Sequence, residues 1–175
     1  MLQIESVVKK CVRLVMIGAI GVCLTAPAAK AQDRLGGHFG VVFPLVTHGN
    51  GDTTNIGDDF KIGFPMGVTV KTSDKWAFDL ELVPVIQNDP LLTSLTVHPG
   101  IVRALSGGYA AGLRMAFDVN QPSWGFTPLV NRGFPVRGHA YALFVEGVVP
   151  IRFQPDPAGG NTTSIGLALH VGIGF

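Results

Sequence analysis

Residues 163–175 at the end of the chain alternate between large apolar and small side chains. The odd positions from Ile165 to Phe175 hold Ile, Leu, Leu, Val, Ile and Phe, while the even positions hold Ser, Gly, Ala, His, Gly and Gly. Successive side chains of a β-strand point to opposite faces, so this strand has one wholly apolar face and one face of small residues with a single imidazole. The pattern restricts the chain to folds in which a sheet separates two very different environments.

The same alternation recurs along the chain and predicts eight strands in all. It is clearest in residues 60–71 and 76–86, which a short Thr72-Ser73-Asp74 turn joins into a hairpin. The weakest is 124–130, which precedes a stretch at 131–137 that we interpret as a turn or irregular link. The predicted strands are 38–47, 60–71, 76–86, 94–104, 109–119, 124–130, 139–153 and 163–175.

Proline is the feature that fits this assignment least well. Six prolines fall inside proposed strands, and proline removes a donor from the hydrogen-bonded ladder. Pro65 and Pro99 are central in their strands, so they weaken the prediction of register most. The six are Pro44, Pro65, Pro84, Pro99, Pro128 and Pro150.

The composition indicates that much of the surface does not face water. Only 14% of the 175 residues are charged, against about 25% in an ordinary soluble domain. The body of the chain has no uninterrupted apolar run long enough for a membrane-spanning helix. A closed barrel also satisfies every backbone group within a bilayer, so the sequence predicts an all-β transmembrane barrel. No basic tract suggests nucleic-acid binding.

The N-terminus has the layout of a secretory signal peptide. Lys9, Lys10 and Arg13 precede an apolar run at 14–24, and the small-x-small sequence at 29–31 is a suitable cleavage site. The run is too short to favour an uncleaved anchor. We therefore predict a signal peptide at 1–31 and a mature domain at 32–175, in which 9 basic residues face 11 acidic ones.

Both cysteines lie in the predicted signal peptide. Cys23 is not preceded by the small residue that a lipoprotein signal requires, because Val22 stands there. Removal of Cys11 with the same segment leaves a mature chain with no thiol, so we expect neither disulfides nor cysteine chemistry.

Together, the signal peptide, the repeated alternation and the hydrophobic-x-aromatic ending Ile173-Gly174-Phe175 resemble the small eight-stranded outer-membrane β-barrels of the OmpA-domain, OmpX and OmpW type. The resemblance implies an antiparallel up-and-down barrel in the cell outer membrane, with lipid around it. It also implies that Ile173 and Phe175 form the insertion signal that the barrel-assembly machinery reads. Loops 49–59, 87–93, 120–123 and 154–162 would lie outside the cell, and the connections at 72–74, 105–108 and 131–137 in the periplasm.

A soluble up-and-down barrel, such as a lipocalin, has the opposite sense, with its apolar face inside. The second face of these strands decides between the two. It consists mostly of Gly, Ala, Ser and Thr with a few charges, which suits the narrow lumen of an eight-stranded barrel. Trp76, Tyr109, Trp124 and Tyr141 fall at or near strand ends, where an aromatic girdle would lie. We therefore expect the large apolar residues to face lipid.

Parity then assigns three cations and four carboxylates to the lumen. Because isolated ions would be costly there, we expect them to pair, with Arg114 bridging to Glu81 or Glu146 as the central contact. These pairs would fill the barrel as a structural plug; alternatively, they would open to form a narrow pore. The predicted lumen set is Lys61, Asp79, Glu81, Arg114, Asp118, Glu146 and Arg152.

Three histidines, His38, His98 and His170, also have inward parity. A metal or proton site is conceivable, but a hydrogen-bonded imidazole in a polar lumen explains them more simply. We assign no metal and no cofactor.

The sequence gives little support for an enzyme. Some small outer-membrane barrels modify lipid with an outward Ser–His–carboxylate set, by resemblance only, and no outward Ser–His pair is visible here. No GxSxG, HExxH, P-loop or CxxC motif occurs either. The expectation is a non-enzymatic envelope barrel with a lumen largely closed by ion pairs. The alternatives are a narrow channel for small or hydrophobic solutes and a lipid-modifying enzyme.

Overall fold

A computed structural model describes residues 34–87, 91–156 and 159–175 of the chain. The signal peptide predicted at 1–31 lies outside the described residues. Residues 35–175 form one compact unit. No helix among the described residues is long and apolar enough to cross a membrane.

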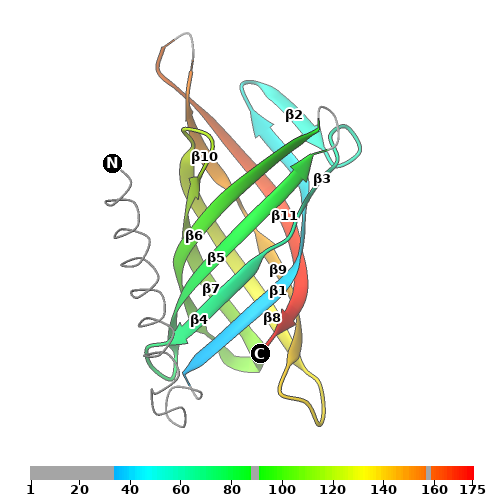
Figure 1. The fold of residues 1–175 in the computed structure, drawn as a ribbon, viewed down its shortest axis with the longest axis vertical. Coiled ribbons are helices and arrows are strands. Elements are labelled where there is room, and N and C mark those ends of the chain that lie inside the picture. The colour runs from blue at the N-terminus through cyan, green and yellow to red at the C-terminus, as the bar shows by residue number, and fades with distance from the viewer. Residues whose placement is uncertain (1–33, 88–90, 157–158) are drawn as a thin grey trace, which may run out of the picture. The chain divides into compact units, whose positions relative to one another are not determined.

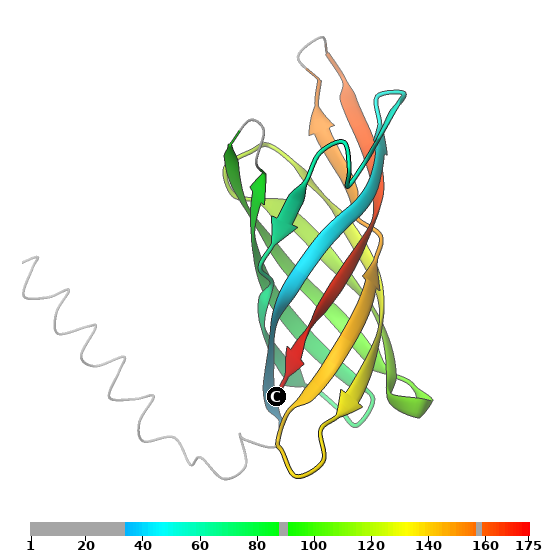
Figure 2. The ribbon, with the colours of Figure 1, turned by 90° about the vertical axis from the view of Figure 1, so that its right-hand side faces the viewer.

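The described unit is an antiparallel barrel with eight strand positions around its wall (Figures 1 and 2). Each position is called a stave here, and two of the staves consist of two shorter strands in succession. β3 and β4 both pair with β1 and β5, so together they form one stave, and β9 and β10 do the same between β8 and β11. The strands are β1 (Leu35–Gly49), β2 (Asp52–Asn55), β3 (Lys61–Gly63), β4 (Met66–Lys71), β5 (Trp76–Gln87), β6 (Leu92–Ala104), β7 (Tyr109–Asp118), β8 (Trp124–Pro135), β9 (Ala142–Val148), β10 (Ile151–Pro155) and β11 (Asn161–Gly174).

The barrel closes between its first and last strands. β1 pairs with β11 from His38↔Gly174 to Gly49↔Ser164, and Phe175 exchanges two backbone hydrogen bonds with Gly37 at 2.8 and 2.9 Å. Closure gives every stave a neighbour on both sides, which confirms the predicted eight-stranded up-and-down topology.

The two ends of the barrel differ. Leu35, Phe175 and the connections 72–75, 105–108 and 136–141 lie at one end, called the terminal end (Figure 2). The 105–108 connection includes a short 3₁₀ turn, η1 (Ser106–Gly108). The connections 50–51, 56–60 and 119–123 lie at the other end, called the loop end.

Several strand boundaries differ from the sequence-based prediction. β8 continues to Pro135, so the turn predicted at 131–137 lies at 136–141 instead. Asn131 and Gly133 are frequent turn residues, but here the Asn131 side chain faces inward and is hydrogen-bonded in the lumen. The predicted loop 49–59 contains β2, which pairs with the end of β1.

The prolines lie where the ladders are interrupted. Pro44 adjoins a register shift between β1 and β11, and Pro65 lies in the break between β3 and β4. Pro150 lies in the break between β9 and β10, beside Pro128 of β8, whose carbonyl accepts a 2.9 Å hydrogen bond from Val149. The β6–β7 ladder lacks its pairs opposite His98 and Pro99. Pro84 faces the break between β3 and β4, where its carbonyl accepts a 2.9 Å hydrogen bond from Phe64. The missing proline donors therefore fall at bulges and breaks rather than disrupting continuous pairing.

The two faces of the wall separate sharply by polarity. Leu113 on β7 is 44% exposed, while its neighbour Arg114 is 3% exposed. The outward face carries the exposed large apolar residues, whereas the side chains buried in the barrel are mainly polar, with a small apolar cluster of Leu129, Val148 and Ala168.

Glycine on the inner face is required at the β1–β11 seam. A Cβ on Gly40 would approach His170 Nε2 to 2.6 Å and would collide with the Val171 carbonyl. We expect Gly40→Val to reduce strongly the fraction of protein that refolds into detergent micelles, measured as the unheated fast-migrating band on a gel.

The matched control is Gly147→Val, because a Cβ on Gly147 meets no atom within 4 Å. The control should refold as the unaltered chain does. Equal refolding of both variants would contradict the packing described for the seam.

Candidate functional site: the charged cluster of the lumen

Three strands contribute the four charged side chains at the centre of the barrel. Asp79 and Glu81 come from β5, Arg114 from β7 and Glu146 from β9, and each is at most 3% exposed. Ions removed from water to this degree require close partners of opposite charge.

Arg114 lies between all three carboxylates. Its Nε donates to Asp79 Oδ2 at 2.8 Å, and its Nη1 donates to Glu146 Oε1 at 2.9 Å and lies 3.4 Å from Glu81 Oε2. The sequence predicts a bridge from Arg114 to Glu81 or Glu146, and in the structure the guanidinium contacts both of them as well as Asp79. One planar cation therefore links β5 to β9 across the barrel.

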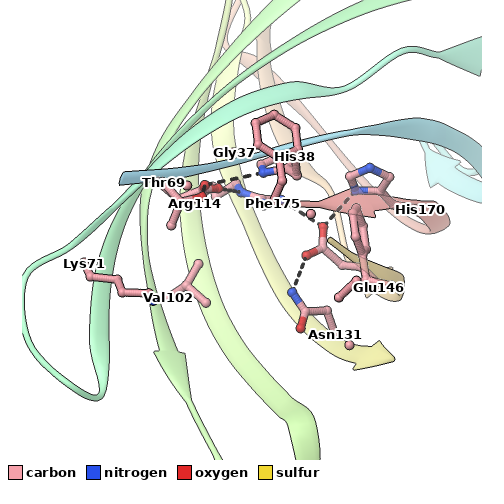
Figure 3. A pocket seen from close by; sticks show the side chains of 16 residues that line it. Gly37, His38, Thr69, Lys71, Val102, Arg114, Asn131, Glu146, His170 and Phe175 are labelled. Atoms are coloured by element: carbon pink, nitrogen blue, oxygen red, sulfur yellow. Dashed lines mark hydrogen bonds and ion pairs between the residues drawn. The ribbon is translucent and has the colours of Figure 1, made fainter. Parts of the chain in front are cut away.

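The strand register produces much of the remaining network. Glu81 pairs with His98 across β5 and β6, and Glu146 lies between His170 on β11 and Asn131 on β8. The corresponding hydrogen bonds measure 3.0 Å for His98 Nδ1 to Glu81, 3.1 Å for His170 Nδ1 to Glu146 and 3.3 Å for Asn131 to Glu146. Figure 3 shows Asn131 and His170 converging on Glu146.

The three inward histidines all contact these carboxylates. His38 Nε2 lies 2.9 Å from Glu81 Oε2, so Glu81 is held by an imidazole on each oxygen. The Nε2 atom of His170 is buried, has no hydrogen-bond partner among the described residues, and lies against Gly40. The histidines thus belong to the same cluster as Arg114.

His98 extends the network towards the loop end. Arg152 Nη2 donates to His98 Nε2 at 3.1 Å, while His98 Nδ1 faces Glu81. An imidazole that accepts on Nε2 carries its proton on Nδ1, so this geometry specifies a neutral His98 that donates to Glu81. Arg152 also donates to Thr127 Oγ1 at 3.1 Å and to the Phe126 carbonyl at 3.2 Å.

Glycines on neighbouring strands make room for these large side chains. Gly100 is the register partner of Arg114, and Gly67 is that of His38. A Cβ at Gly100 would meet Arg114 Cγ at 2.6 Å, and one at Gly67 would collide with the His38 ring. The glycines of the inner face therefore leave the space that the side chains of the charged cluster fill.

Two members of the predicted lumen set lie outside the central cluster. Lys61 Nζ pairs with Asp59 at 2.8 Å near the loop end, where both side chains are partly exposed. Asp118 accepts a hydrogen bond from Thr96, its register partner on β6. Both residues line the cavity on the loop side of the cluster.

The cluster separates two cavities. A cavity of about 300 Å³ opens towards the terminal end beside Gly36, Lys71 and Phe175. A second of about 250 Å³ lies towards the loop end beside Lys61, Val83 and Arg152. Arg114, Glu146 and His170 line both cavities, so these three side chains form the wall between them. Figure 3 shows the three among the residues that line the terminal cavity.

Sequence reasoning missed two aspects of this site. Asn131 was assigned to a turn, and only the extension of β8 brings its amide to Glu146. The loop cavity also has an apolar side, formed by inward residues that include Val42, Val83 and Val148. The inward parity of these valines was visible in the sequence, but their convergence depends on the register.

Glu81, Glu146 and His170 place potential metal-ligand atoms within 4.8 Å of one another. Arg114 Nη1 already lies 2.9 Å from Glu146 and 3.4 Å from Glu81. The guanidinium therefore takes the position that a cation would occupy, and the residues do not fit a resident metal.

No family model matches the chain, and no curated protein sequence matches it. Among solved structures, the chain is similar to the outer membrane protein OprG from Pseudomonas aeruginosa, with 12% sequence identity and a TM-score of 0.43. The match covers 80% of this chain and 93% of OprG. At this distance the likeness carries no argument about the site, and the barrel architecture is established by the strand pairings of this chain.

Removing the guanidinium should be strongly destabilising, because it leaves three buried carboxylates without their cation. We expect Arg114→Leu to lower the free energy of unfolding in urea by about 3–5 kcal/mol. Lys61→Leu, which removes the cation of a partly exposed pair, should cost less than about 1 kcal/mol.

A combined Arg114→Leu, Asp79→Asn and Glu146→Gln variant should recover part of the lost free energy of unfolding. It removes two of the carboxylate charges that Arg114→Leu leaves without a cation. An Arg114→Leu variant as stable as the unaltered barrel would contradict the central role of this residue.

Proposed function

We propose that this chain is an integral barrel of a Gram-negative-type outer membrane, with a lumen closed by the Arg114 cluster and a structural, non-enzymatic role in the envelope. The observation that carries the proposal is the contrast between the two faces of the wall. Large apolar residues are exposed on the outside, whereas Asp79, Glu81, Arg114 and Glu146 are buried within.

The outward face is suited to lipid rather than to water. Its apolar residues include Leu80, Leu113, Leu143 and Leu167, each at least 40% exposed. A soluble protein rarely exposes so extensive an apolar surface. In a membrane barrel the same face is the hydrocarbon-facing band, and aromatic residues flank it at both ends.

The aromatic residues are placed as such a girdle requires. At the terminal end, β5 begins at Trp76 and β7 begins at Tyr109, while Tyr141 immediately precedes β9. Trp124 lies at the loop end and packs on Phe126 and Phe153, with ring centroids 5.8 and 4.8 Å away. By analogy with known barrels, the terminal end would face the periplasm and the loop end the cell exterior.

The closed lumen is inferred from the wall between the two cavities. Arg114 is hydrogen-bonded to Asp79 and Glu146, and neighbouring histidines hold the carboxylates from the other side. Opening a path would require breaking several buried charge-assisted hydrogen bonds together, each stronger than a neutral one. This cooperation favours a plug over a pore.

The role of the C-terminal residues is part of the same proposal. Phe175 is 68% exposed and remains paired to Gly37 at the seam. An exposed aromatic residue at the end of β11 is accessible to assembly machinery, so Ile173 and Phe175 are proposed as the insertion signal.

The second candidate is a narrow channel for small solutes. It is favoured by the presence of a cavity on each side of the cluster, because only a thin layer of side chains separates them. Single-channel recording in planar bilayers distinguishes the two functions directly.

For a closed barrel, we expect no resolved conductance steps from the purified, refolded protein. Arg114→Ala removes the side chain that links β5 to β9 and should produce small, measurable steps. Lys61→Ala, outside the cluster, should remain silent. Conductance steps from the unaltered protein would favour the channel over the plug.

A further inference from the structure

We propose that the outer surface of β5, β6, β7 and β8 near the terminal end binds the phosphate headgroup of an anionic phospholipid. This inference rests on the proposed membrane location. The binding surface, called the arginine–aromatic patch, consists of Arg103, Arg132, Tyr109 and Trp76 around Ala111.

The patch contains an unusual pair of charges for this face. Most charged side chains on the described staves point into the barrel. Arg103 and Arg132 are the two charged residues on these staves that point outward, as their alternation with inward residues indicates. Neither guanidinium has a carboxylate within 4.0 Å among the described residues, and both arginines are exposed. Two unpaired cations on an apolar face indicate an anionic partner.

Aromatic rings hold both guanidiniums in place. Arg103 Cζ lies 5.4 Å from the centroid of Trp76, its register partner on β5. Arg132 Cζ lies 5.0 Å from the Tyr109 ring and 5.2 Å from the Phe134 ring, and its Nη1 donates to the Tyr109 hydroxyl at 3.2 Å. Stacking on a ring leaves guanidinium N–H groups free for a second partner.

The register brings the two arginines to either side of one strand. Arg103 pairs with Ala111 of β7, and Tyr109 of the same strand pairs with Arg132 of β8. Neighbouring strands are about 4.8 Å apart, so β6 and β8 are separated by roughly 10 Å, which two long side chains can span. Ala111, the smallest outward residue of β7, lies between the two strands that carry the arginines.

The charge of the whole terminal end supports an anionic partner. Its described connections and strand ends carry Arg34, Lys71, Lys75, Arg103, Arg132 and Arg137 against Asp74. The described part of the loop end is instead acidic, with Asp52, Asp58, Asp59, Asp118 and Asp156 against Lys61 and Arg152.

The chemistry of the patch selects among lipids. Arginine binds phosphate through paired N–H donors, and basic residues near a bilayer surface attract anionic lipid. Phosphatidylglycerol carries an uncompensated phosphate, whereas the ammonium of phosphatidylcholine offsets its charge. The patch is therefore expected to enrich phosphatidylglycerol over phosphatidylcholine.

Trp76 lies in the patch and can report its occupancy. In a Trp124→Phe background, the refolded barrel is placed in phosphatidylcholine vesicles that contain a minor amount of brominated phosphatidylglycerol or, separately, brominated phosphatidylcholine. We expect the phosphatidylglycerol probe to quench Trp76 about fivefold more strongly at equal mole fraction. In a Trp76→Phe background, Trp124 at the loop end should show no such preference.

Arg103→Gln with Arg132→Gln should abolish the preference at Trp76. The control, Lys75→Gln with Arg137→Gln, removes two positive charges from connections at the same end and should retain most of it. Equal quenching by the two lipids, or an equal loss in both double variants, would overturn the patch. If neither lipid quenches either tryptophan, the outward face is not in lipid and the proposed membrane location itself fails.

Discussion

Closure of the sheet is the constraint on which the rest of this structure depends. Pairing β1 with β11 leaves no stave with a free edge, so the backbone hydrogen bonds are satisfied within the wall. It also directs every second side chain towards a common axis that is only wide enough for side chains to fill. Polar residues on that face must then satisfy one another.

The Arg114 cluster is the solution that this chain adopts. One guanidinium contacts three carboxylates. Three imidazoles are hydrogen-bonded to carboxylate oxygens of the same cluster. The large side chains fit because their register partners or neighbours include Gly67, Gly100 and Gly40. Charge, hydrogen bonding and volume are thus matched together, and replacing one member disturbs all three.

Alternation predicted the eight staves, and the small residues of the second face predicted the inward direction of Arg114 and its partners. The antiparallel order was implied by the resemblance to small outer-membrane barrels. Alternation could not predict which ions meet, because contacts across the lumen depend on a register that the prolines interrupt. Asn131 illustrates the difficulty, since its turn propensity is overridden when its amide bonds Glu146. Likewise, Arg103 and Arg132 became a pair only once β6 and β8 were placed on either side of β7.

The account depends most on which face of the wall meets lipid, and site-directed spin labelling measures this directly. Single cysteines can be introduced once Cys11 and Cys23, the two native cysteines of the chain, have been replaced by serine. Labels at Leu113 and Leu143 should collide often with oxygen and rarely with a water-soluble nickel complex, as in a bilayer. Frequent collision with nickel at both positions would contradict the account, because the apolar face would then lie in water.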